Sequence, residues 1–234
     1  YYVLGPDEPN APGHLWRTAD SWPPKSRTRS FYLAADKKLA LQPPEKEASL
    51  SFQYDPKNPC PTLGGRNLVL KHGPFDQSKL AGRSDVLVFS SEPLKENIEI
   101  AGRIECVLFV STDAKDTDFV VKLCDGYPDG RQMLVADGIV RLSRREWPKP
   151  PVPVEPGKVL SVRVDLGNMA YVFAKGHRVV VHITSSNHPR YDANPNTGKL
   201  SWQEKEPKRA KNMVYFGGER ASRLVLPVWS GGGK

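Results

Sequence analysis

The sequence contains no long apolar run. Its apolar residues come in short groups broken by proline, glycine or charge, far below the ~20 consecutive residues that a membrane-spanning helix needs. We therefore expect no membrane segment. The first residues, Tyr1 to Gly5, carry neither a basic region nor a long apolar core, so no signal peptide is expected. Because the sequence does not start with methionine, we expect a fragment or a processed product.

Cysteine is scarce. The three cysteines, Cys60, Cys106 and Cys124, are widely spaced. An odd number at such spacing matches neither a disulfide framework nor a zinc site. The sequence therefore predicts three free thiols, no metal and no cofactor, in a reducing, cytoplasmic setting.

A hydrolase nucleophile is also missing. The elbow of an α/β-hydrolase needs Gly-x-Ser-x-Gly between a strand and a helix. The nearest match, Gly82 to Val86, ends in valine and leads into a strand pattern. His177 and His182 are out of phase with their apolar neighbours, which predicts surface or sheet-face positions. We assign no catalytic residue to this chain.

The formal net charge is +8, and one interpretation of such a surplus is a nucleic-acid partner. However, acidic residues are interspersed with the basic ones, even in the dense stretch Lys205 to Lys211. No RNA-binding aromatic motif or zinc-finger spacing accompanies them. We therefore expect that the protein has no nucleic-acid partner.

Short alternating segments dominate the chain, separated by many of its 22 prolines and 19 glycines. Alternation of apolar and polar residues is typical of strands with one buried face. No alternation of strands with helices is visible, so we predict an all-β fold: an antiparallel jelly-roll β-sandwich, similar to galactose-binding domains, with few short helices. The expected strands cover residues 29–35, 38–41, 49–54, 85–90, 98–111, 118–124, 132–142, 159–166, 170–173, 177–184 and 223–229.

Two long segments lack a strand pattern, residues 55–82 and 185–213, the second with a short helix near Trp202 to Lys205. Loops of this length in compact domains are usually functional or dock onto something. We expect residues 1–27 to be an irregular linker or tail of an upstream domain, residues 28–230 to be the sandwich, and residues 231–234 to be a flexible tail.

Two binding functions remain open from the residues alone. Asp113, Asp116 and Asp118 are possible calcium ligands, but capping of turns by aspartate is the stronger interpretation. Aromatic residues in or near loops would suit a carbohydrate-binding module. These aromatic residues are Trp147, Tyr191, Trp202 and Tyr215.

Several motifs follow one another in an order that resembles one known family. They are Trp16-Arg17, Trp22-Pro23, Asp55-Pro56, Pro59 to Gly65, Gly73 to Gln77, Arg83 to Leu87, Asp116 to Phe119, Asp125 to Arg131, Asp137 to Arg141, Gly176 to Arg178 and Ser185 to Gly198. Together they resemble the C-terminal non-catalytic domain of the CocE/NonD serine hydrolases, the family of cocaine esterase and X-Pro dipeptidyl-peptidase. Gly126 and His188 depart from the family pattern.

The resemblance implies an accessory jelly roll, inactive alone, that packs on an upstream α/β-hydrolase domain carrying the Ser-Asp-His triad. It implies that Leu68, Val69 and Leu70 help wall the pocket for a small ester or amide substrate. It also implies a domain-interface loop formed by Asn187, Pro189, Arg190 and Tyr191. The choice between esterase and peptidase stays open, as does a homo-oligomer formed through the docking face.

Overall fold

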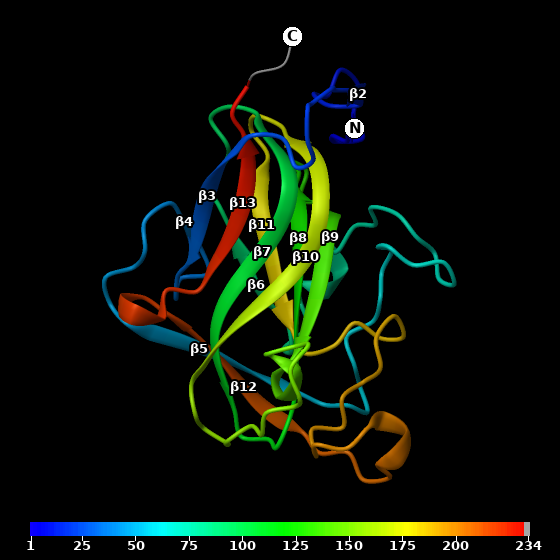
Figure 1. The fold of residues 1–234 in the computed structure, drawn as a ribbon, viewed down its shortest axis with the longest axis vertical. Coiled ribbons are helices and arrows are strands. Elements are labelled where there is room, and N and C mark those ends of the chain that lie inside the picture. The colour runs from blue at the N-terminus through cyan, green and yellow to red at the C-terminus, as the bar shows by residue number, and fades with distance from the viewer. Residues whose placement is uncertain (232–234) are drawn as a thin grey trace.

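The computed structural model describes residues 1–231. Two antiparallel sheets face each other (Figure 1), and every strand pair within them is antiparallel. The predicted all-β sandwich is therefore confirmed. Of the predicted flexible tail, residues 232–234 lie outside the described residues.

The larger sheet has the order β4-β3-β13-β7-β12-β5, and β10 also pairs with β7. The smaller sheet has the order β6-β11-β8-β9. The strands of the larger sheet are β3 (Ser26–Leu33), β4 (Leu39–Ala40), β5 (Ala48–Tyr54), β7 (Ile98–Thr112), β10 (Leu160–Phe173), β12 (Ala210–Phe216) and β13 (Arg223–Trp229). Those of the smaller sheet are β6 (Leu87–Ser90), β8 (Asp118–Gly126), β9 (Gln132–Arg141) and β11 (Arg178–Thr184).

The core lies between the sheets and follows the alternation of the strands. On β8, Phe119 and Leu123 belong to this core, whereas Lys122 and Cys124 point to the opposite face of the sheet. Aromatic pairs join the two layers, such as the edge-to-face contact of Phe52 with Phe119, whose ring centres are 6.2 Å apart. The outer face of the smaller sheet is thus left for other segments to cover.

Three features differ from the sequence prediction. No strand was expected at β12, and its residues up to 213 were expected to be loop. Strand β10 is one strand rather than two, because a register shift next to Gly167, whose φ is +82°, lets the ladder continue. Residues 1–27 are not wholly irregular, since β1 (Tyr2–Val3) pairs with β2 (Leu15–Trp16).

The helices are single 3₁₀ turns of three residues, as the prediction of few short helices requires. Among the described residues, none of them is long enough to cross a membrane. The helix expected near Trp202 is the turn η3. The four turns are η1 (Ser78–Leu80), η2 (Leu142–Arg144), η3 (Ser201–Gln203) and η4 (Gly218–Arg220).

Candidate docking and substrate-facing site

The long segment between β5 and β6 covers the outer face of the smaller sheet. Cys60 and Leu80 are buried there against Val86. Near its end, the amide of Gln77 donates to the Gln132 carbonyl at 2.8 Å, and the amide of Leu134 donates to the Phe75 carbonyl at 3.1 Å. We call residues 60–77 the flap. It is fixed to β9 by backbone hydrogen bonds rather than hanging free.

The flap carries a small hairpin, which we call the tip (residues 65–73). Gly65 and Gly73 exchange two backbone hydrogen bonds, of 2.8 and 3.2 Å, and the teal segment between them projects away from the sheets in Figure 1. At its end, Leu68 and Val69 are 101% and 94% exposed. Leu70 is half-buried, and its amide donates to the side chain of Asn67 at 2.7 Å. Two apolar side chains are therefore held out in solvent by an ordered turn.

The predicted domain-interface loop after β11 joins the flap at one carboxylate. Asp137 on β9 accepts hydrogen bonds from the guanidinium of Arg190 and, at 3.0 Å, from the side-chain amide of Asn187. The amide of Thr62 in the flap donates to the His188 carbonyl at 2.7 Å. The two loops singled out from the sequence therefore form one connected unit. Within the loop after β11, Pro189 is exposed.

Tyr191, the fourth predicted residue of that loop, is half-buried. The guanidinium of Arg190 lies 5.0 Å from the centre of its ring. Burial, followed by the charge of Asp137, raises the pKa of the Tyr191 hydroxyl. This side chain is therefore partly engaged within the fold rather than free on the surface.

A cavity of about 720 Å³ lies beside the tip. Its lining includes the apolar side chains of Leu134 and Met169, which come from β9 and β10. Of the three predicted pocket residues, Leu68 lines it. Arg66 also lines the cavity and is anchored there by a 2.8 Å hydrogen bond to the Leu166 carbonyl. Its size and mainly apolar lining match those of a small-molecule site.

The N-terminal segment also lines this cavity, which sequence reasoning missed. Val3 is fully buried against the outer side of the larger sheet, with Ala101 and Val172. The amide of Leu4 donates to the Ala170 carbonyl at 3.0 Å, and Leu4 itself lines the cavity. The only signal in the sequence was the apolar pair Val3-Leu4 within a stretch rich in proline.

His177 and His182 were expected at the surface or on a sheet face, and both are buried, so the surface alternative was wrong. His182 lies on the outer sheet face, opposite Lys122. His177 is 3% exposed. Its Nδ1 lies 3.0 Å from a carboxylate oxygen of Asp125, and its Nε2 lies 3.5 Å from a carboxylate oxygen of Glu8 in the N-terminal segment. His182 is 1% exposed because the flap covers its face of the sheet, and its Nε2 contacts Gln132. Within residues 1–231, no histidine ring nitrogen makes a hydrogen bond to a serine.

The predicted calcium candidates serve as hydrogen-bond acceptors. Asp116 accepts from the hydroxyl of Ser143 at 2.7 Å, and Asp118 pairs with Arg141 at 2.8 and 3.0 Å. Asp113 accepts from a backbone amide at 2.8 Å. Among the described residues, no three His, Cys, Asp or Glu side chains are grouped to hold a metal.

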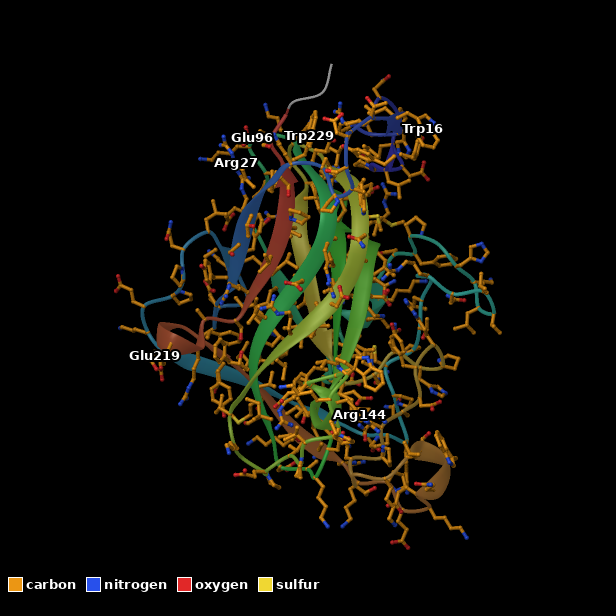
Figure 2. The ribbon with its side chains drawn as sticks, in the orientation of Figure 1. Trp16, Arg27, Glu96, Arg144, Glu219 and Trp229 are labelled. Carbon is orange, nitrogen blue, oxygen red and sulfur yellow. The ribbon has the colours of Figure 1, made fainter. Side chains whose placement is uncertain are left out.

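Of the four aromatic residues considered for sugar binding, Trp147 and Trp202 are about three-quarters exposed, at 74% and 73%. Tyr215 is tied down, with its hydroxyl 3.0 Å from that of Ser111. Figure 2 shows a further exposed tryptophan, Trp16, on the hairpin formed by β1 and β2.

These features define a class of protein: a two-sheet antiparallel domain with an ordered apolar tip beside an apolar cavity. A family model for the X-Pro dipeptidyl-peptidase C-terminal non-catalytic domain matches residues 1–225. The chain belongs to this family, the non-catalytic domain of CocE/NonD-type hydrolases.

Known proteins agree with this assignment. The chain is 38% identical to the cocaine esterase of a Rhodococcus strain, over 97% of this chain and 41% of that protein. In structure it resembles an aminopeptidase from a marine sediment Thaumarchaeota archaeon, with a TM-score of 0.84 and 31% identity over 93% of this chain and 39% of that one. It also resembles an α-amino acid ester hydrolase, with a TM-score of 0.80 and 30% identity over 92% of this chain and 38% of that one. The chain therefore spans about two-fifths of these relatives' length.

Proposed function

We propose that this chain is the accessory domain of an acyl esterase or X-Pro dipeptidyl-peptidase-like serine hydrolase. It packs on a preceding α/β-hydrolase domain, which carries the Ser-Asp-His triad, and helps to wall the active site for a small ester or amide substrate. It breaks no bond by itself. The buried free thiols Cys60, Cys106 and Cys124 support a reducing, cytoplasmic setting.

The observation that carries the proposal is the exposure of Leu68 and Val69. Ordered apolar side chains that stand clear of their own domain mark a contact with another surface or ligand. The tip is held by its two glycines and by the flap, so it presents these side chains in one place. An accessory domain that walls a pocket needs such a preformed apolar projection, because ordering a free loop on binding would cost conformational entropy.

The first test uses the chain alone with p-nitrophenyl esters and X-Pro amides, and no turnover is expected.

The second test uses the full-length hydrolase with Leu68→Ser combined with Val69→Ser. Loss of apolar contact is expected to weaken transition-state binding of an ester with an apolar acyl group, lowering kcat/KM about tenfold or more. Leu41→Ser is the matched control, since Leu41 is also exposed, at 60%, but lies after β4, away from the tip.

Two outcomes would contradict the proposal. One is turnover by the isolated chain that disappears when one of its own residues is substituted. The other is an unchanged kcat/KM in the tip variant together with unchanged association between the two domains.

The exposure of Trp147 and Trp202 favours a second candidate, a carbohydrate-binding module. Exposed aromatic rings can stack on sugars, and the two tryptophans are free to do so. A glycan array with and without chelator tests this function. Saturable binding that is lost in Trp202→Ala would support the module, whereas no binding at all would leave the accessory domain as the function.

A further inference from the structure

A buried lysine lies beneath the flap. Lys122 on β8 is 1% exposed, and its ammonium donates to the side-chain oxygen of Gln77 at 2.9 Å. Within the described residues, Gln77 provides the one hydrogen-bond acceptor for this ammonium. Burial lowers the pKa of Lys122, which is the usual effect when a cation is removed from water.

Gln77 also pairs its side-chain amide with the flap and its backbone amide with β9. Its side-chain amide donates to the Leu63 carbonyl at 2.8 Å and to the Phe75 carbonyl at 3.0 Å. Its backbone amide donates to the Gln132 carbonyl at 2.8 Å. The fully buried Gln77 therefore contacts the chain on both sides of the tip, at Leu63 and Phe75. It also contacts β9 directly and β8 through Lys122.

This arrangement costs stability. A buried ammonium with one neutral acceptor loses more hydration than it regains, and replacing both partners of such a contact by apolar side chains is often equal or better for stability. The neighbours of Lys122 are mixed: it faces Asp137 on β9 and His182 on β11 across the ladders, and Cys124 and Val180 form a small apolar cluster nearby. The buried ammonium therefore adds little net stability, so global stability does not by itself account for the lysine.

What the lysine contributes is a fixed position for the flap. Apolar contacts alone tolerate sliding and repacking, whereas a directional hydrogen bond between two buried groups favours one arrangement. We propose that Lys122 and Gln77 are positioning residues that lock the flap in one register and thereby set where Leu68 and Val69 project. The functional part of this inference rests on the proposed function above.

The test in the isolated chain is Lys122→Met. Amide hydrogen exchange of residues 65–73 is expected to become about tenfold faster, since one buried hydrogen bond to a charged group is lost locally. The melting temperature is expected to fall by only a few degrees, because the buried side-chain oxygen of Gln77 loses its one partner within the described residues. Lys211→Met, at an exposed lysine on β12, is the matched control and should change neither quantity.

Coupling between the two residues gives a second measurement. Gln77→Leu should speed exchange in the tip more than Lys122→Met does, because it also removes the side-chain hydrogen bonds to the Leu63 and Phe75 carbonyls. The double variant should be no faster than Gln77→Leu, because the contact with Lys122 is already lost there. The proposal is overturned if tip exchange in Lys122→Met equals that of the unmodified chain. It is equally overturned if exchange in the core strand β7 speeds up as much as exchange in the tip, since Lys122 would then support the whole fold rather than the position of the flap.

In the full-length hydrolase, Lys122→Met should raise KM several-fold with kcat retained, because a mobile tip weakens substrate binding without touching the reacting atoms. Faster exchange with an unchanged KM would uphold the positioning role in the flap and count against the tip as a pocket wall. The two proposals can therefore fail separately.

Discussion

Arg190 directs one guanidinium nitrogen at both carboxylate oxygens of Asp137, joining the loop after β11 to the middle of β9. The two side chains are only 12% and 2% exposed. Asn187, in the same loop as Arg190, also donates a hydrogen bond to Asp137. Because the flap is hydrogen-bonded to this loop at His188, the pair supports both segments that we expect to face the catalytic domain.

We predict that the Asp137–Arg190 pair is strongly coupled. Asp137→Leu alone leaves a buried guanidinium without its partner and should lower the free energy of unfolding by about 3–5 kcal/mol. Asp137→Leu combined with Arg190→Met removes both charges and should recover most of that loss. Urea denaturation of the two single variants and the double variant measures the effect. Losses that simply add would contradict a direct pair.

The burial of His182 predicts a pH dependence of stability. Burial, followed by the charge of Lys122, lowers the pKa of His182 to about 4 from its ordinary 6.5. Between these pH values the unfolded chain binds a proton that the folded chain does not. The free energy of unfolding should therefore fall by about 3 kcal/mol as the pH drops from about 7.5 to 4, and His182 should contribute almost no pH dependence above about 7.5.

The measurement for His182 is the difference between the unmodified chain and His182→Gln in urea midpoints from pH 4 to 7. Other buried groups also titrate, so the difference isolates this residue. His72→Gln, at an exposed histidine on the tip, should leave the pH dependence as it is. A His182→Gln variant with the same slope as the unmodified chain would show that His182 is accessible to protons in the folded state.

Gly138 marks a close approach of the two sheets. A Cβ atom at this position on β9 would lie 2.1 Å from the carbonyl oxygen of Asp165 on β10. Because that atom is backbone, Gly138→Ala should force the strands apart and lower the free energy of unfolding by about 2–3 kcal/mol. Gly82→Ala is the matched control, as a Cβ there meets nothing within 4 Å. Equal stability of the two variants in urea would mean that β9 and β10 are not so closely packed.

Most strands could be predicted from the sequence because their alternation is local. Strand β12 was missed because two of its inward positions, Ala210 and Asn212, are not strongly apolar, and basic residues precede it. Asn212 is fully buried and donates to the hydroxyl of Ser185 at 2.7 Å. The weak apolar signal is thus compensated by a hydrogen bond to Ser185, the residue that follows β11, and no local pattern reveals this contact.

The site was harder to predict than the fold, for a physical reason. Lys122 and His182 look like solvent-facing strand residues, and only the flap, from a distant part of the sequence, makes them buried. The link between Asp137 and Arg190 likewise joins residues 53 positions apart. The resemblance to a family brought out both loops, but the contacts that hold them together depend on tertiary structure.

All three cysteines are free and buried, so we predict that they are unreactive in the folded chain. Burial raises the pKa of Cys106 to about 12 and also raises that of Cys60 and Cys124. The thiolate is the reactive form, so iodoacetamide at pH 8 should label none of them under native conditions and all three in guanidinium chloride. Mass spectrometry counts the labels. Rapid native labelling of any one thiol would contradict its burial.

The N-terminal segment gives a test of the domain boundary. We predicted residues 1–27 as a linker or tail, yet Val3 is fully buried and Arg17 pairs with Glu99 through two hydrogen bonds, of 2.7 and 2.8 Å. Burying a valine stabilises by roughly 1.5–3 kcal/mol, so deletion of residues 1–17 should lower the free energy of unfolding by at least that amount. Trp16→Ala removes a large but 77% exposed side chain and should cost less than about 0.5 kcal/mol. A deletion variant that unfolds at the same urea concentration as the whole chain would support the linker interpretation, because the segment's contacts would then contribute nothing to the sandwich.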